Sequence, residues 1–237
     1  MLTQLKNIAR RLPLVPRLYR WYSRLNFNDS QSYWEQRYQS GGNSGAGSYG
    51  RLAQFKAEVL NDFVREHNID SVIEFGSGDG HQLSLAQYPS YTGLDVSQRA
   101  IDLCRQRFDG DDAKRFVHYN PVMHDSAVTD ENGTPLEADL SLSLDVIYHL
   151  VEDKVFDTYM RHLFAAGRRF VIVYSSNDPE ACLTAAHVRH RRFTDWVEAH
   201  APQWRFQERI ANRFPFDASD ADETSFADFY IFEHVDG

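Results

Sequence analysis

The chain has 237 residues, enough for one domain of ordinary size with a buried core. Hydrophobic residues make up 42% of the chain and aromatic residues 14%, which excludes wholesale disorder. The formal net charge of −9 argues against bulk nucleic acid as a partner. Cys104 and Cys182 have neither metal-ligand nor redox spacing, and no apolar run approaches the roughly 20 residues of a membrane-spanning helix. We therefore expect a soluble protein of the reducing cytoplasm.

The start of the chain is basic, unlike the acidic remainder. Residues 1–28 contain no acid and allow two interpretations. They either contact an anionic surface at the inner face of a membrane, or pack as a helix on their own domain with the cations in water. Pro13 and Pro16 interrupt the helical pattern and favour packing on the domain. The cations are Lys6, Arg10, Arg11, Arg17, Arg20 and Arg24.

A glycine-rich stretch, SGGNSGAGSYG at residues 40–50, divides the chain. Small polar residues and glycines of this kind favour a flexible lid or linker. A short aromatic helix is predicted before it, over residues 32–38, and the apolar spacing after it predicts a helix over residues 52–63. We therefore expect a basic, aromatic extension with a lid over residues 1–50 and the main domain over residues 51–237.

From residue 70 onward, apolar strands alternate with amphipathic helices. Ser97 is a suitable N-cap for the second of these helices. The alternation predicts an α/β fold, a doubly wound sheet with helices on both faces that binds ligands at the carboxyl ends of its strands. Strands are predicted over 71–75, 91–94, 115–119, 140–144, 169–174, 204–210 and 227–234, and helices over 82–87, 98–108, 155–164 and 193–200.

The most informative stretch is SVIEFGSGDGHQLSL, residues 71–85. After a short buried strand, Gly76, Gly78 and Gly80 let the backbone turn sharply and approach a ligand closely. Dinucleotide folds use the spacing G-x-G-x-x-G at such a turn. Here His81 stands where that pattern needs its third glycine, so a dinucleotide fits poorly.

Two later segments add to this signal. Asp95 ends the second strand, 21 residues after Glu74, where a carboxylate can accept hydrogen bonds from both hydroxyls of a ribose. The alternative, that Asp95 only caps the next helix, is weakened by Ser97. The second segment is ADLSLSLDVIYHL, residues 138–150, a buried strand that leads into Asp145.

In this order the three segments resemble the motifs of the class I S-adenosylmethionine-dependent methyltransferases, from about residue 70 to residue 174. The resemblance implies a mostly parallel, seven-stranded, Rossmann-like sheet with an antiparallel last strand, and S-adenosylmethionine as cofactor. Asn120, with Asp125 as an alternative, matches the position that reaches the adenine. The segment from Tyr33 to Tyr38 resembles a W-x-x-R-Y element that covers the cofactor. The cofactor-binding residues implied are Tyr33, Arg37, Glu74, Gly76, Ser77, Gly78, Asp95, Val96, Asn120 and Leu144.

Methyl transfer is an in-line displacement, in which a base is needed only when the acceptor must lose a proton. His149 is the candidate base, because histidine titrates near neutral pH and lies one helical turn beyond Asp145. Tyr148 is expected to shape the acceptor pocket. The alternative is that His149 is a structural residue hydrogen-bonded to a neighbour.

The sequence also allows a metal-binding interpretation. Some metal-dependent relatives carry an E-x-x-E-H element, which is resembled here by Asp145, Tyr148 and His149, with His187 and His190 downstream. Tyr148 replaces one carboxylate, so we expect no metal. The basic run of residues 187–192 either contacts an anionic acceptor or is a solvated helix start.

The expected function is methyl transfer to an oxygen or nitrogen of a modest-sized acceptor. A sugar of a cell-surface glycan or its lipid-linked precursor is favoured, because residues 1–28 allow peripheral membrane contact. A small metabolite or a peptide is an alternative. A rival of another class is a non-catalytic nucleoside-binding partner subunit.

Overall fold

The computed structural model describes Phe27 and residues 29–123, 127–181 and 185–236. The predicted membrane contact of residues 1–28 falls, apart from Phe27, outside these residues. No helix of the described part is long and apolar enough to cross a membrane. The strands are β1 (Val72–Phe75), β2 (Tyr91–Asp95), β3 (Lys114–His118), β4 (Ala138–Leu144), β5 (Gly167–Ser175), β6 (Trp204–Ile210) and β7 (Asp228–His234).

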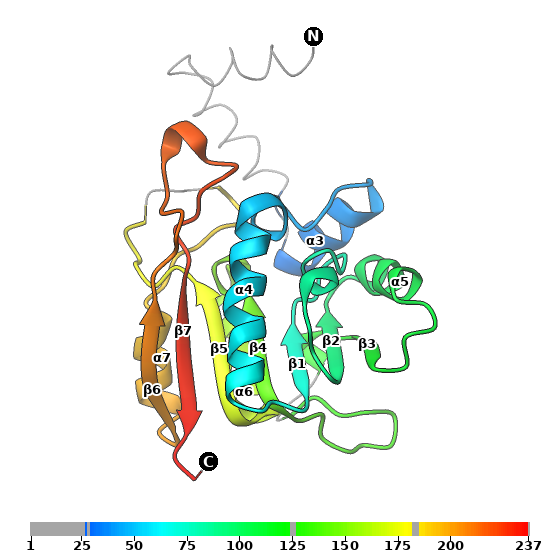
Figure 1. Cartoon of the computed structure of the whole chain (residues 1–237). Coiled ribbons are helices and arrows are strands. Elements are labelled where there is room, and N and C mark those ends of the chain that lie inside the picture. The colour runs from blue at the N-terminus through cyan, green and yellow to red at the C-terminus, as the bar shows by residue number, and fades with distance from the viewer. Residues whose placement is uncertain (1–26, 28, 124–126, 182–184, 237) are drawn as a thin grey trace.

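The strands form one seven-stranded sheet in the order β3-β2-β1-β4-β5-β7-β6. Strands β1 to β5 are parallel, and β7 runs antiparallel to both β5 and β6 (Figure 1). The predicted mostly parallel, seven-stranded sheet with an antiparallel last strand is confirmed. The chain order reverses between β1 and β4, and in open α/β sheets such a switch point places a ligand crevice at the carboxyl ends of the strands.

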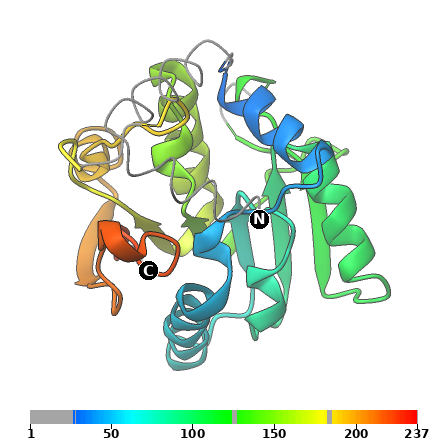
Figure 2. The same cartoon turned by 90° about the horizontal axis from the view of Figure 1, so that it is seen from above.

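Helices cover both faces of the sheet, as predicted (Figures 1 and 2). On one face lie α4 (Gly50–Glu66) and α5 (Gln98–Arg107), which contribute Leu60 and Ile101 to one buried cluster. On the other lie α6 (Asp153–Ala166) and α7 (Phe193–His200), which contribute to the second cluster. The Ser97 hydroxyl accepts a hydrogen bond from the Ala100 N–H and caps α5, as predicted.

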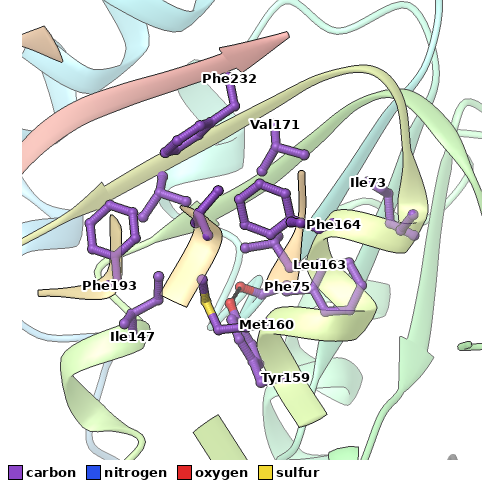
Figure 3. Packing of buried hydrophobic residues seen from close by; sticks show 14 of the residues in the cluster. Ile73, Phe75, Ile147, Tyr159, Met160, Leu163, Phe164, Val171, Phe193 and Phe232 are labelled. Carbon is purple, nitrogen blue, oxygen red and sulfur yellow. Dashed lines mark hydrogen bonds between the residues drawn. The ribbon is translucent and has the colours of Figure 1, made fainter. Parts of the chain in front are cut away.

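The second cluster includes side chains of β1 (Figure 3). Ile73 and Phe75 pack on its side of the sheet, against Met160 and Leu163 of α6. Because side chains alternate along a strand, Glu74 between them faces the other side, toward α4. The packing of β1 therefore decides which face of the sheet receives the carboxylate.

Helix α3 (Ser30–Gln39) lies beyond the carboxyl ends of β1 and β2 (Figure 1). Asp29 caps it by accepting a hydrogen bond from the Ser32 N–H. The helix predicted over residues 32–38 is thus present and longer by a few residues.

The predicted helix over residues 82–87 is wrong. The chain forms only a 3-10 turn, Gln82–Leu85, before β2. Six residues make fewer than two α-helical turns, which does not offset the cost of helix nucleation, and Pro89 prevents extension. The glycine turn is therefore followed by a tight connection rather than by a regular helix.

Candidate functional site

A cavity opens at the carboxyl ends of β1, β2 and β4, beneath α3. Most of the predicted site residues line it, whereas Tyr33, Arg37 and Tyr148 are not among its lining residues. The predicted residues that line it are Glu74, Gly76, Ser77, Gly78, Asp95, Val96, Asn120, Leu144, Asp145 and His149.

The glycine turn requires glycine for two reasons. Gly76 has a φ of +91° and Gly78 a φ of +58°, a region that residues with a Cβ avoid. A Cβ on Gly76 would lie 2.4 Å from Cγ2 of Val146, and one on Gly78 would lie 2.3 Å from the Ser44 hydroxyl oxygen. The turn thus packs directly against the segment after β4 and against the segment before α4.

Asp95 holds this turn in place. Its Oδ2 accepts the N–H of Gly78 and its Oδ1 accepts the N–H of Ser97, both at 2.9 Å. Burial raises the pKa of Asp95 to about 6, while the two backbone N–H groups favour the charged form. A carboxylate has about four lone-pair sites, so each oxygen keeps one for a ligand hydroxyl.

Glu74 is fixed from another direction. Its Oε2 accepts a hydrogen bond of 2.7 Å from the Tyr91 hydroxyl. Burial raises the pKa of Glu74 to about 7, against the effect of Tyr91 and of the Lys56 charge. The family resemblance implies that this acid orders the glycine loop. In the structure Asp95 accepts the Gly78 N–H and the Ser44 hydroxyl accepts the Asp79 N–H, whereas Glu74 bonds to the Tyr91 hydroxyl.

Helix α3 presents a different pair of residues to the cavity than predicted. Trp34 and Tyr38, four residues apart, line it. Tyr33 and Arg37 share the neighbouring face of the helix, where Tyr33 stacks on His187 at 4.3 Å between ring centroids. The Arg37 Nε donates to the Asn43 carbonyl oxygen at 2.7 Å. Arg37 therefore braces the lid segment.

The glycine-rich residues 40–50 close over the glycine turn. Ser44 donates its N–H to Asp79 and accepts the Asp79 N–H on its hydroxyl, at 3.1 and 2.9 Å. The Tyr49 hydroxyl donates to the same Asp79 carboxylate at 2.6 Å. Although burial acts to raise it, the pKa of Asp79 is held below its usual value by Tyr49 and by backbone N–H groups. The lid is thus hydrogen-bonded to the turn itself.

The other end of α3 is attached at the far end of the cavity. The Ser30 hydroxyl donates to the His149 carbonyl oxygen at 2.7 Å, and the Ser30 N–H donates to Glu152 at 3.0 Å. The Asn120 amide donates to Gln31 at 2.9 Å, while its oxygen accepts the Val122 N–H. The alternative to Asn120, Asp125, lies outside the described residues. Helix α3 therefore covers the cavity, and hydrogen bonds hold the chain at both ends of this helix.

Asp145 forms the clearest charged contact of the site. It follows β4 with a φ of +60°, and its Oδ2 accepts a hydrogen bond of 2.6 Å from the Lys56 ammonium. Its Oδ1 accepts the Tyr148 hydroxyl at 2.9 Å. Tyr148, expected in the acceptor pocket, thus lies behind Asp145 and orients it.

Lys56 is a residue of the site that was not predicted from the sequence. The side chain is 1% exposed and lines the cavity from α4. It sits four residues from both Leu52 and Leu60, within the apolar stripe that predicted this helix. A lysine inside such a stripe was the available signal, since a buried ammonium needs a partner.

His149 is held in one protonation state. Its Nδ1 lies 2.9 Å from the His187 carbonyl oxygen, which can only accept, so Nδ1 carries the proton. Burial lowers the pKa of His149 to about 4, with that hydrogen bond acting in the other direction. The expectation that His149 titrates near neutral pH is therefore wrong. At neutral pH the imidazole is uncharged and keeps the lone pair of Nε2.

The basic run of residues 187–192 has a structural role. Arg189 and Arg191 pair with Asp153 at 2.8 and 3.1 Å, at the start of α6. Asp153 thus offsets the charge of both arginines, of which Arg191 is mostly buried and Arg189 is exposed, and contact of this run with an anionic acceptor stays a prediction. His190 Nδ1 lies 2.7 Å from the Ser176 hydroxyl. Among the described residues no group of three or more His, Cys, Asp or Glu side chains is arranged to hold a metal ion.

No protein-family model and no curated protein matches the sequence. Solved structures do match the fold. NodS, an N-methyltransferase from Bradyrhizobium japonicum WM9 in complex with S-adenosyl-L-homocysteine, aligns with a TM-score of 0.65 and 15% identity, over 87% of this chain and 99% of NodS. The chain has the fold of the class I methyltransferases.

Two further methyltransferases share this fold. Magnesium protoporphyrin IX methyltransferase (ChlM) from Synechocystis PCC 6803, with bound S-adenosylhomocysteine, aligns with a TM-score of 0.59 and 12% identity, over 89% of this chain and 97% of ChlM. CalS10 from Micromonospora echinaspora, an amino pentose methyltransferase with bound S-adenosylmethionine, aligns with a TM-score of 0.58 and 11% identity, over 78% of this chain and 92% of CalS10.

The protonation state of His149 is open to a direct test. Because burial favours the neutral imidazole, protonation requires a lower pH than the ordinary value of about 6.5. A nitrogen-detected NMR titration should show the His149 ring neutral, with the proton on Nδ1, from pH 8 down to below pH 5, and a midpoint at about 4. A midpoint near 6.5, or a proton on Nε2 in the neutral form, would contradict the assigned hydrogen bond to His187.

Proposed function

We propose that the chain is an S-adenosylmethionine-dependent methyltransferase that acts on an amine nitrogen or a hydroxyl oxygen of a modest-sized, sugar-like acceptor. One observation carries the proposal. Asp95 lines a cavity at the switch point of the sheet, and both of its oxygens hold backbone N–H groups while keeping lone pairs for a ribose diol.

The chain offers one set of groups for each part of the cofactor. Asp95 would accept the ribose hydroxyls, and Val96 and Asn120 would lie toward the adenine. The backbone of Gly76 and Gly78 would approach the methionine part, where a Cβ has no room. Ser77, Leu144, Trp34 and Tyr38 complete the lining around these groups.

The cofactor supplies an electrophilic methyl group on a positively charged sulfur. The acceptor lone pair forms the new bond to the methyl carbon, the carbon–sulfur bond breaks with its electron pair left on sulfur, and the acceptor loses a proton. The protein accelerates the step mainly by holding the two partners in line. His149, neutral and with Nε2 unprotonated, is the group we assign to receive the proton.

The charge of the lining supports an acceptor that is neutral or cationic. Among the described side chains that line the cavity, the carboxylates are Asp29, Glu74, Asp95, Asp145 and Glu152, whereas Lys56 is the one Lys or Arg. An anionic acceptor would be repelled by this set. The fold neighbours NodS, an N-methyltransferase, and CalS10, an amino pentose methyltransferase, support an amino sugar. Placement of that sugar in a cell-surface glycan or its lipid-linked precursor rests on the basic residues 1–28 alone.

Cofactor binding is tested by isothermal titration calorimetry with S-adenosylmethionine and S-adenosylhomocysteine. The unaltered chain should bind both. Asp95→Ala should weaken both at least about 100-fold, because two charge-assisted hydrogen bonds to the ligand are lost together with the support of the turn. Asp102→Ala, an exposed change on α5, should leave both affinities within about twofold. If the unaltered chain binds neither ligand, the proposal fails.

The acceptor class is tested by transfer of an isotopically labelled methyl group to a panel of amino sugars, neutral sugars and acidic sugars. We expect transfer to amino sugars and no transfer to acidic sugars, which carry a carboxylate and no amino group. His149→Ala should lower the turnover by about 10²- to 10⁴-fold, the range for loss of a general base, while cofactor affinity stays within about threefold. Preferred methylation of acidic sugars would overturn the assignment.

A further inference from the structure

The Lys56–Asp145 ion pair is the least expected feature of the site. The Lys56 ammonium lies 2.6 Å from Asp145 and 5.2 Å from the ring centroid of Tyr174, with almost no exposure to solvent. Burying an ammonium costs several kcal/mol unless a partner compensates it, and apolar residues of similar volume often serve stability equally well. A buried pair in the wall of a ligand cavity is therefore a candidate for a functional role.

The pair lies at a definite end of the cavity. Val146, the residue after Asp145, contacts Gly76 closely enough that a Cβ there would lie 2.4 Å away. On the lid side, a Cβ on Gly47 would lie 2.8 Å from Oδ2 of Asp145. Asp145 is thus enclosed by the glycine turn and the lid. If Asp95 holds the ribose, the amino-acid end of the cofactor and its sulfonium lie toward Asp145.

The two members of the pair are placed asymmetrically. The Asp145 side chain is 14% exposed, whereas that of Lys56 is 1% exposed. The Tyr148 hydroxyl holds the other carboxylate oxygen at 2.9 Å, so Asp145 is fixed from two directions. Glu74 is a further titratable group near the Lys56 ammonium. The positive charge of Lys56 acts to lower the pKa of Glu74. A ligand in the cavity therefore meets the carboxylate of the pair first and the ammonium behind it.

We propose that the Lys56–Asp145 pair selects the methyl donor by its charge. Asp145 attracts the positively charged sulfonium of S-adenosylmethionine. Lys56 positions the Asp145 carboxylate and offsets part of its negative charge. The inference rests on the proposed function. Transfer leaves the bonding electron pair on sulfur, so the sulfonium becomes a neutral thioether. Asp145 then attracts the product less than the donor, which favours release of the product.

The experiment compares the dissociation constants of S-adenosylmethionine and S-adenosylhomocysteine by calorimetry at low ionic strength, where charges are least screened. Asp145→Asn should raise the ratio of the donor constant to the product constant roughly tenfold, since it removes the attraction and leaves Lys56 uncompensated. Lys56→Met should lower the same ratio roughly threefold or more. A purely structural pair would weaken both ligands equally and leave the ratio unchanged.

A double variant keeps the test valid if Lys56→Met alone does not fold, because Lys56→Met/Asp145→Asn buries no unpaired charge. Its ratio should fall below that of Asp145→Asn toward that of the unaltered chain. Asp139→Asn is the matched control, since Asp139 is 15% exposed, lies near the start of β4, the strand that Asp145 follows, and pairs with Arg168 away from the cavity. That variant should leave the ratio within about twofold.

The outcomes separate the two proposals. If the unaltered chain binds neither ligand, the proposed function fails. If it binds both and the ratio stays constant within about twofold across the Asp145 and Lys56 variants, the charge selection is overturned while the proposed function stands.

Discussion

The geometry of the site depends on where the Asp95 carboxylate lies. At the end of β2 it accepts N–H groups from the glycine turn after β1 and from the start of α5, so one side chain joins two loops. The backbone reinforces this, because the N–H groups of Gly76 and Ser77 both donate to the Leu94 carbonyl oxygen. Without these contacts the turn would lose the partners that hold its positive-φ conformation, and the floor of the cavity would lose its shape.

The extension before α4 belongs to the site as much as the sheet does. Ser30 attaches α3 near His149, and Ser44 exchanges hydrogen bonds with Asp79 at the opposite end. Trp34 and Tyr38 lie between these attachments and face the cavity. Residues 30–44 therefore contribute to the wall of the cavity together with the carboxyl ends of the strands. The boundary at residue 50, between the N-terminal extension with its lid and the main domain, stays a prediction.

The inner strands of the sheet, β1, β2, β4, β5 and β7, were predictable from local sequence because they are short, mostly buried runs bounded by turn residues. The positions of Gly76 and Asp95 follow from the strands that precede them. The position of Lys56 in an apolar stripe signals a buried lysine, but its partner was not predictable, because Asp145 is 89 residues away and only the fold brings them together. The orientation of Arg37 was not predictable either, because the face it occupies on α3 is decided by how Trp34 and Tyr38 pack. Its contact with the cofactor stays a prediction.

Under the proposed function, the cavity beneath α3 would hold S-adenosylmethionine with its ribose on Asp95 and its amino-acid end toward Asp145. A crystal structure of the chain with S-adenosylhomocysteine tests this orientation. We expect both ribose hydroxyls within hydrogen-bonding distance of the Asp95 carboxylate and the amino-acid end between Gly76 and Asp145. A ligand bound outside this cavity, or bound in it with the ribose away from Asp95, would show that the proposed site is wrong.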